Sequence, residues 1–136
     1  MNILHNPKSI AATFSNYAHG VETPEQARWL HVSGQVGVLA NGQLAEGPQA
    51  QMEQCWRNIL AILESANMGA ADVVKVVAYL THQEDVKLYR DIRDRMLDGV
   101  ETASTLLVIS GLAHPDWRVE IEVIAATTEP LSATPA

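Results

Sequence analysis

The chain has 136 residues, of which 47% are hydrophobic and 18% are charged, and its formal net charge is −7. This balance is typical of one soluble globular domain, which we expect over residues 1–126, followed by a flexible tail over residues 127–136. Lys and Arg form no cluster, and the acidic charge argues against a nucleic-acid partner and, more weakly, against an anionic membrane surface.

The N-terminal ten residues are polar and mixed, without the apolar segment of a secretory signal, and no apolar run is long enough to span a bilayer. Cys55 is the single cysteine, so no disulfide can form within the chain. Both features favour the cytoplasm. Cys55 falls on the apolar stripe of a predicted helix, which favours a buried packing side chain over a nucleophile.

The first half of the chain predicts strands followed by a helix. Residues 28–33 (RWLHVS) alternate as in a strand, and residues 13–19 are expected to form another. The Asn41-Gly42 pair is a turn signal. Pro48 suits a first helical turn, apolar residues recur at helical spacing from there to Ala66, and Gly69 is well placed to end the helix.

The second half predicts a strand, a helix and two more strands. Residues 73–80 (VVKVVAYL) are β-branched and continuous, as in a buried strand, and a helix is expected over residues 84–97, closed by Gly99. Residues 104–109 (STLLVI) and 118–126 (RVEIEVIAA) form two strands joined by a loop. The order β-β-α-β-α-β-β predicts an α+β fold with both helices on one face of the sheet.

Two predicted strands are apolar on both faces. Leu106 and Val108 point to one side of their strand, while Leu107 and Ile109 point to the other. Two helices can cover only one face, so a monomer would leave an apolar patch exposed. The sequence therefore predicts an obligate homo-oligomer whose sheets pack together, and leaves the number of subunits open.

Several short motifs, in their order and spacing, resemble the RidA (YjgF) family between about residues 17 and 125. They are SNYA at residues 15–18, HVSGQ at 31–35, NMG at 67–69, ADVVKV at 71–76 and VEIEVIA at 119–125. The resemblance implies a chorismate-mutase-like fold and a homotrimer. It also implies small-molecule sites in clefts between subunits, where the last strands of one subunit meet the Tyr- and Ser-bearing segments of the next.

The resemblance further implies hydrolysis of reactive enamines and imines, such as 2-aminoacrylate, to a keto acid and ammonia. Glu120 takes the place of the family's water-positioning acid, and Tyr17, Ser33 and Gly34 match residues that line its pocket. A carboxylate can orient water or shuttle protons. We expect no metal or organic cofactor, since an imine carbon is already electrophilic.

Ser104 departs from the family, because it stands where the carboxylate-binding arginine belongs. A hydroxyl cannot neutralise a carboxylate, so we expect a non-standard substrate. Arg90 stands where the family's deaminases tend to have an asparagine; it is either a solvated helix residue or a substitute cation. His114 is either an acid–base group or an exposed loop residue, and Trp117 is a packing residue close enough to the cleft to line it.

Two other functions stay open. The trimer could bind a small molecule without turnover, as a sensor or a chaperone-like protein, and ligand-dependent stabilisation without product would indicate this. Nucleic-acid binding or RNA cleavage has been linked to relatives in the family, but the net charge of −7 disfavours it.

Overall fold

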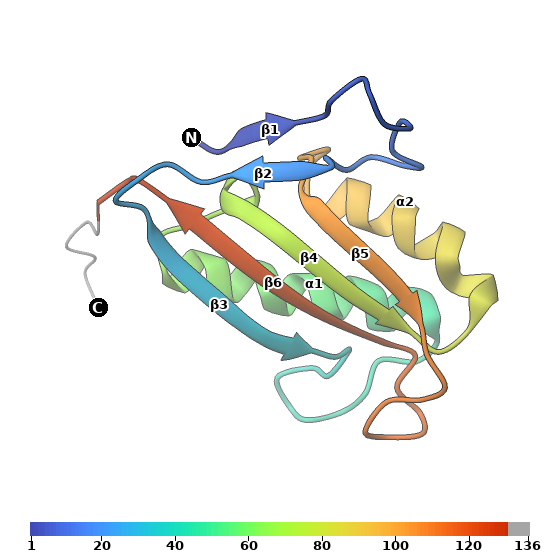
Figure 1. Ribbon diagram of the computed structural model, residues 1–136. Helices are drawn as coiled ribbons and strands as arrows, with labels where there is room; N and C mark the ends of the chain where they lie inside the picture. Colours follow the sequence, from blue (N-terminus) through green and yellow to red (C-terminus); the bar gives the residue numbers. More distant parts are fainter. Residues whose placement is uncertain (131–136) are drawn as a thin grey trace.

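The computed structural model describes residues 1–130, which form a mixed four-stranded sheet with two helices on one face (Figure 1). The sheet has the order β3-β6-β4-β5. Its strands are β3 (Arg28–Gln35), β4 (Val73–Leu80), β5 (Ala103–Val108) and β6 (Val119–Thr127). The helices are α1 (Pro48–Ser65) and α2 (Val86–Met96). Short 3₁₀ turns precede β4 and α2, η1 (Ala70–Asp72) and η2 (Gln83–Asp85).

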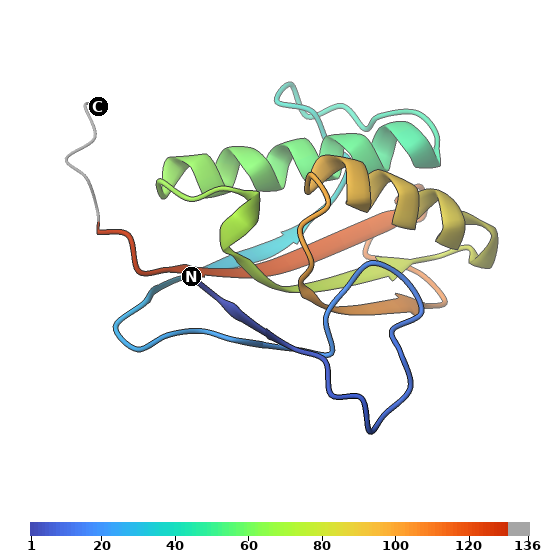
Figure 2. The same ribbon diagram turned by 90° about the horizontal axis from the view of Figure 1, so that it is seen from above.

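The N-terminal segment forms a separate two-stranded sheet from β1 (Ile3–His5) and β2 (Gly20–Glu22). Figure 2 shows both helices on one side of the main sheet and strands β1 and β2 on the other side, while the loop between β1 and β2 reaches toward α2. The expected arrangement of two helices on one face is therefore confirmed.

The pairing register of the strands decides on which face of the sheet each side chain lies. β4 and β5 run parallel, with α2 in the connection between them, whereas β6 lies antiparallel between β3 and β4. A parallel pair needs such a crossover connection, which here returns the chain to the outer edge of the sheet beside β4. Ser104 pairs with Val76 of β4, and Glu120 pairs with Tyr79 of the same strand.

The core lies between the sheet and the helices. The apolar stripe of α1 is fully buried, and Cys55 belongs to it, as expected for a packing side chain. Alternate residues of β4 and β6 meet this stripe from the sheet. The buried residues of these three elements include Met52, Cys55, Trp56, Ile59, Leu63, Val76, Ala78, Leu80, Val119, Ile121 and Val123.

The face of the sheet away from the helices is partly apolar, as the sequence predicts. Val77 of β4 and Ile124 of β6 are half-buried there, and Leu107 of β5 has 44% of its surface exposed. Trp29 of β3 has 52% of its surface exposed. A second copy covering this face stays a prediction.

The prediction of a strand over residues 13–19 is wrong. The structure places strands on either side of it, and within it only Ala18 makes an isolated bridge, to Ala103. Side chains and backbone bond locally instead: Thr13 Oγ1 donates to the Ser15 carbonyl at 3.1 Å, and the Tyr17 N–H donates to the same oxygen at 3.0 Å. Such local bonds compete with a strand ladder.

Several element boundaries also differ from expectation by one or two residues. The final strand continues through Thr127, which is buried against the sheet and pairs with Arg28, so the folded part extends past residue 126. Residues 131–136 of the expected tail lie outside the described residues. The first turn of the second helix is the 3₁₀ turn η2, and α2 begins at Val86. Within residues 1–130, no helix is both long and apolar enough to cross a membrane.

Candidate functional site

Three of the predicted site residues, Tyr17, Arg90 and Ser104, line one hollow of about 140 Å³ between α2, β5 and the N-terminal segment. Ser104 reaches it because its partner Val76 points into the core, and paired residues in a ladder share a face. The side chain of Ser104 therefore lies on the helix-covered face. The other lining residues are Phe14, Ser15, Arg93 and Leu106.

Arg93 contributes a second guanidinium to this hollow. Its side chain is 4% exposed, lies 3.0 Å from Oδ1 of Asp94, and donates to Oγ of Ser15 at 3.4 Å. Its Cζ also lies 6.0 Å from the centre of the Tyr89 ring. Sequence reasoning missed Arg93, although its spacing of three from Arg90 places both on one side of α2.

Arg90 differs from Arg93 in its partners. Its Nε is buried and has no hydrogen-bond partner among residues 1–130, and the ion pairs of that part of the chain do not include it. A buried donor without a partner is unusual in folded proteins. The hollow thus contains one guanidinium that Asp94 neutralises and one that no described carboxylate neutralises.

Glu120 lies elsewhere, on the face of the sheet away from the helices. It pairs with Tyr79, whose neighbours in β4 point into the core, so Glu120 points to the uncovered face. Its carboxylate lies against Gly34: a Cβ placed on Gly34 would be 2.1 Å from Oε2 of Glu120. Ser33 and Gly34 lie where the register between β3 and β6 shifts, between Val32 and Gln35. The structure therefore brings together Glu120, Gly34 and, beside Gly34, Ser33.

The same face holds an ordered polar pair. Tyr79 donates its hydroxyl to Oε1 of Glu122 at 2.7 Å, and this bond, with some desolvation, raises the pKa of Tyr79. Lys75 Nζ donates to Oγ1 of Thr105 at 3.0 Å. Glu122 thus has a structural partner on this face, while Glu120 lies against backbone.

His114 and Trp117 lie in the loop between β5 and β6. Their rings stack, with centres 5.6 Å apart and planes inclined by 28°. His114 is exposed and its Nδ1 accepts the N–H of Asp116 at 3.1 Å. The loop leads directly into β6, two residues before Glu120, but neither ring lines the hollow that contains Ser104.

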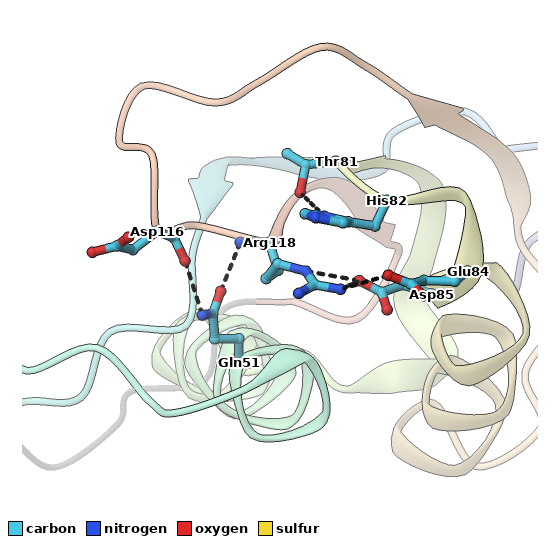
Figure 3. A network of polar contacts seen from close by, with 7 residues as sticks. All are labelled: Gln51, Thr81, His82, Glu84, Asp85, Asp116 and Arg118. Atoms are coloured by element: carbon cyan, nitrogen blue, oxygen red, sulfur yellow. Dashed lines mark hydrogen bonds and ion pairs between the residues drawn. The ribbon is translucent and has the colours of Figure 1, made fainter.

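Buried side chains hold this loop in place (Figure 3). Gln51 of α1, 3% exposed, donates to the carbonyl of Asp116 at 3.1 Å and accepts the N–H of Arg118 at 2.8 Å. The guanidinium of Arg118 donates to Oδ2 of the buried Asp85 through Nη2 at 2.8 Å and Nε at 3.1 Å. Sequence reasoning missed this network because its members are far apart in the chain.

Ser104 and Glu120 therefore lie on opposite faces of one sheet. The residues of the hollow and the residues around Glu120 cannot line a common cavity within one chain. The sequence also matches a known family over most of the chain: the family described as Endoribonuclease L-PSP matches residues 7–127. The chain belongs to this family, also called RidA or YjgF.

Individual relatives support this membership. A RutC family protein of Aquifex aeolicus is 31% identical over 99 residues, covering 71% of this chain and 79% of the relative. The structure of the Rid family protein YyfB of Yersinia pestis, described as of unknown function, has a TM-score of 0.85 at 26% identity, over 93% of this chain and 98% of YyfB. That of RidA from the Antarctic bacterium Psychrobacter sp. PAMC 21119 has a TM-score of 0.70 at 30% identity, over 85% and 92%.

This RidA-family chain carries side chains that can act on a small molecule. Glu120 is a carboxylate that can accept a proton, and the hollow beside Ser104 offers guanidinium and hydroxyl donors for an anion. Within residues 1–130, no three His, Cys, Asp or Glu side chains lie close enough together to hold a metal ion.

Proposed function

We propose that this RidA-family chain hydrolyses the C–N bond of a reactive imine or enamine without a cofactor. The observation that carries the proposal is the placement of Glu120, whose carboxylate lies beside the bare backbone of Gly34 on the face of the sheet away from the helices. A carboxylate in such a place can orient a water molecule and accept its proton. Membership of the family supports the same reaction class.

The reaction balances with water alone. Water attacks the imine carbon and gives a proton to Glu120, which passes this proton to the nitrogen and so forms a carbinolamine. The hydroxyl proton of the carbinolamine then moves through Glu120 to the nitrogen, the C–N bond breaks, and ammonia leaves a carbonyl compound with Glu120 again ionised. An enamine first becomes an imine by gaining a proton at carbon and losing one at nitrogen.

We also propose that the complete site forms between two copies of the chain, within a homotrimer. Glu120 with Gly34 and Ser33 would come from one copy, and the hollow containing Tyr17, Arg90 and Ser104 from the next. The opposite-facing placement of Ser104 and Glu120 supports this arrangement. The partly apolar open face, including Trp29 and Leu107, supports the association.

The substrate differs from that of the arginine-bearing members of the family. Ser104 offers one neutral hydrogen bond in place of a bidentate, charge-assisted pair, which weakens carboxylate binding at that position. A substrate whose anionic group lies away from Ser104, near another cation of the hollow, fits these residues better.

The test is release of keto acid and ammonia from freshly generated 2-aminoacrylate and from larger imines. Glu120→Ala is expected to lower the rate about 100-fold or more, as for loss of a general base. Glu122→Gln is the matched control, because it changes a carboxylate on the same strand face and keeps an acceptor for Tyr79. If Glu120→Ala were as active as the unchanged protein, the proposal would be wrong.

The same experiment tests the second function, ligand binding without turnover. The hollow with its unneutralised Arg90 favours ligand binding in either case. Thermal stabilisation by imine analogues, with no product from any imine, would support a binding protein over an enzyme.

A further inference from the structure

The geometry points to Arg90 as the anion-binding group of this site, so that the substrate is a small monocarboxylate whose carboxylate enters the hollow between α2 and β5. This inference names the substrate class of the proposed reaction and rests on the proposed function only for the chemical step. The binding claim stands on the hollow itself.

The polar side chains of the hollow are all potential donors. It is lined by the guanidinium groups of two arginines and by three hydroxyls, and none of its lining residues carries a carboxylate. Its volume of about 140 Å³ suits a carboxylate with a short carbon chain. The hydroxyls belong to Ser15, Tyr17 and Ser104.

The charge of the hollow indicates a ligand with one negative charge. Asp94 lies 3.0 Å from the guanidinium of Arg93 and neutralises it. The Nε of Arg90 is buried without a partner among residues 1–130, and burying a donor of a charged group without an acceptor is costly. A ligand carboxylate would satisfy this donor and balance the single excess positive charge.

The apolar residues of the hollow fit the rest of such a ligand. Leu106 forms one wall and packs against the core, and Phe14, with 85% of its surface exposed, belongs to the rim. The small side chain of Ser104 leaves room for the ligand. A long side chain at this position of β5 would occupy the space between the strand and Arg90.

The first experiment compares binding of pyruvate with binding of pyruvamide, its uncharged analogue, by calorimetry. We expect the protein to prefer pyruvate. Arg90→Gln should weaken pyruvate binding about 10- to 100-fold and leave pyruvamide binding unchanged. Arg90→Lys keeps the charge but loses the bidentate donor, so it should retain part of the preference for pyruvate over pyruvamide.

The matched control is Lys87→Gln, because Lys87 lies on the same helix, is 88% exposed, pairs with Asp91 and does not line the hollow. It removes the same charge from α2 and should leave pyruvate binding unchanged. Circular dichroism of each variant shows whether weaker binding comes from loss of the guanidinium or from unfolding of the chain. Equal pyruvate affinity in Arg90→Gln and the unchanged protein would overturn the inference, as would a protein that does not bind pyruvate at all.

A second experiment moves the cation from α2 to β5. Ser104→Arg alone should weaken pyruvate binding, because a third guanidinium would crowd and repel the two already present. The double variant Arg90→Gln with Ser104→Arg should bind pyruvate better than either single variant. Tighter binding by Ser104→Arg with Arg90 in place would contradict the inference.

Activity is read separately from binding. If pyruvate binding follows Arg90 but no variant hydrolyses any imine, the proposed hydrolysis fails and the anion site stands. If imines are hydrolysed but pyruvate binding ignores Arg90, the anion site fails and the hydrolysis stands.

Discussion

The carboxylate of Glu120 occupies the space that a side chain at Gly34 would need. A Cβ on Gly34 would lie 2.1 Å from Oε2 and 2.8 Å from Cδ of Glu120, far inside van der Waals contact. The absence of a side chain at residue 34 therefore leaves room for the carboxylate at this place.

Gly34→Ala should consequently disable the site without unfolding the chain. The end of the Glu120 side chain can swing aside, so we expect a stability change below about 1 kcal/mol, but a loss of imine hydrolysis of about 10-fold or more. Gly111→Ala is the control, since a Cβ there meets no atom within 4 Å. Rate measurements on both variants check this, and full activity in Gly34→Ala would show that the position of Glu120 is unimportant.

Gln51 should contribute to the free energy of unfolding although it is uncharged and lies outside the proposed site. Gln51→Ala removes two hydrogen bonds to the loop before β6 and leaves the N–H of Arg118 and the carbonyl of Asp116 without this partner. The expected loss is about 1–3 kcal/mol of unfolding free energy, measured by urea denaturation. Gln49→Ala, at an exposed position of the same helix, should cost under about 0.5 kcal/mol. Equal losses in the two variants would show that the loop does not depend on Gln51.

Tyr89→Phe should not destabilise the chain, although Tyr89 is fully buried. Its hydroxyl has no hydrogen-bond partner among residues 1–130. Removing the hydroxyl therefore breaks no hydrogen bond and removes the cost of burying an unpaired polar group. We expect unfolding free energy to stay constant or rise by about 1 kcal/mol. Tyr79→Phe is the comparison, because it loses the bond to Glu122. A larger loss in Tyr89→Phe than in Tyr79→Phe would mean that the Tyr89 hydroxyl has an acceptor after all.

Alkaline pH should destabilise the chain, beginning with Cys55. Burial raises the pKa of this thiol above its ordinary value of 9.0. Above that pH the unfolded chain loses a proton that the native chain keeps, so unfolding free energy falls as pH rises, by up to about 1.4 kcal/mol per pH unit. Below that pH the thiol is protonated in both states and its contribution is constant.

Cys55→Ala should delay this decline by roughly one pH unit, to where the tyrosines begin to ionise. The pKa values of Tyr79 and Tyr89 are also raised from their ordinary 10.0, the first mainly by its bond to Glu122 and the second by burial. Urea denaturation between about pH 7 and pH 10.5 gives the comparison. Parallel pH dependence in both proteins across that range would rule out a contribution from Cys55.

Local pattern was enough to predict most of the main sheet and helices. β4 begins and ends at the predicted residues. A run of β-branched residues bounded by Gly69 and by the polar residues after Leu80 is typical of a buried strand. α1 begins at Pro48 as predicted, but Gly69 does not end it: Asn67 takes the left-handed conformation, with φ 56°. Asn tolerates this conformation better than most residues, so the glycine two positions later misled the prediction.

The candidate site was less accessible to sequence reasoning. The resemblance to the family led to Tyr17, Arg90 and Ser104, which the structure places around one hollow, and to Glu120 with Gly34, which it places together elsewhere. Arg93 and Ser15 were missed because their roles depend on a contact across 78 residues of chain. The alternation of a strand shows which residues share a face, but not which helix covers that face.

The register of β4 with its two neighbours has a consequence for mixtures of defective chains. Because Ser104 pairs with the core-facing Val76 and Glu120 pairs with the outward-facing Tyr79, each chain supplies two different halves to two different sites of the proposed trimer. A chain lacking Glu120 and a chain lacking Arg90 would each have low activity alone. Co-assembled, they would complement one another, since some junctions would join the intact half of one chain to the intact half of the other.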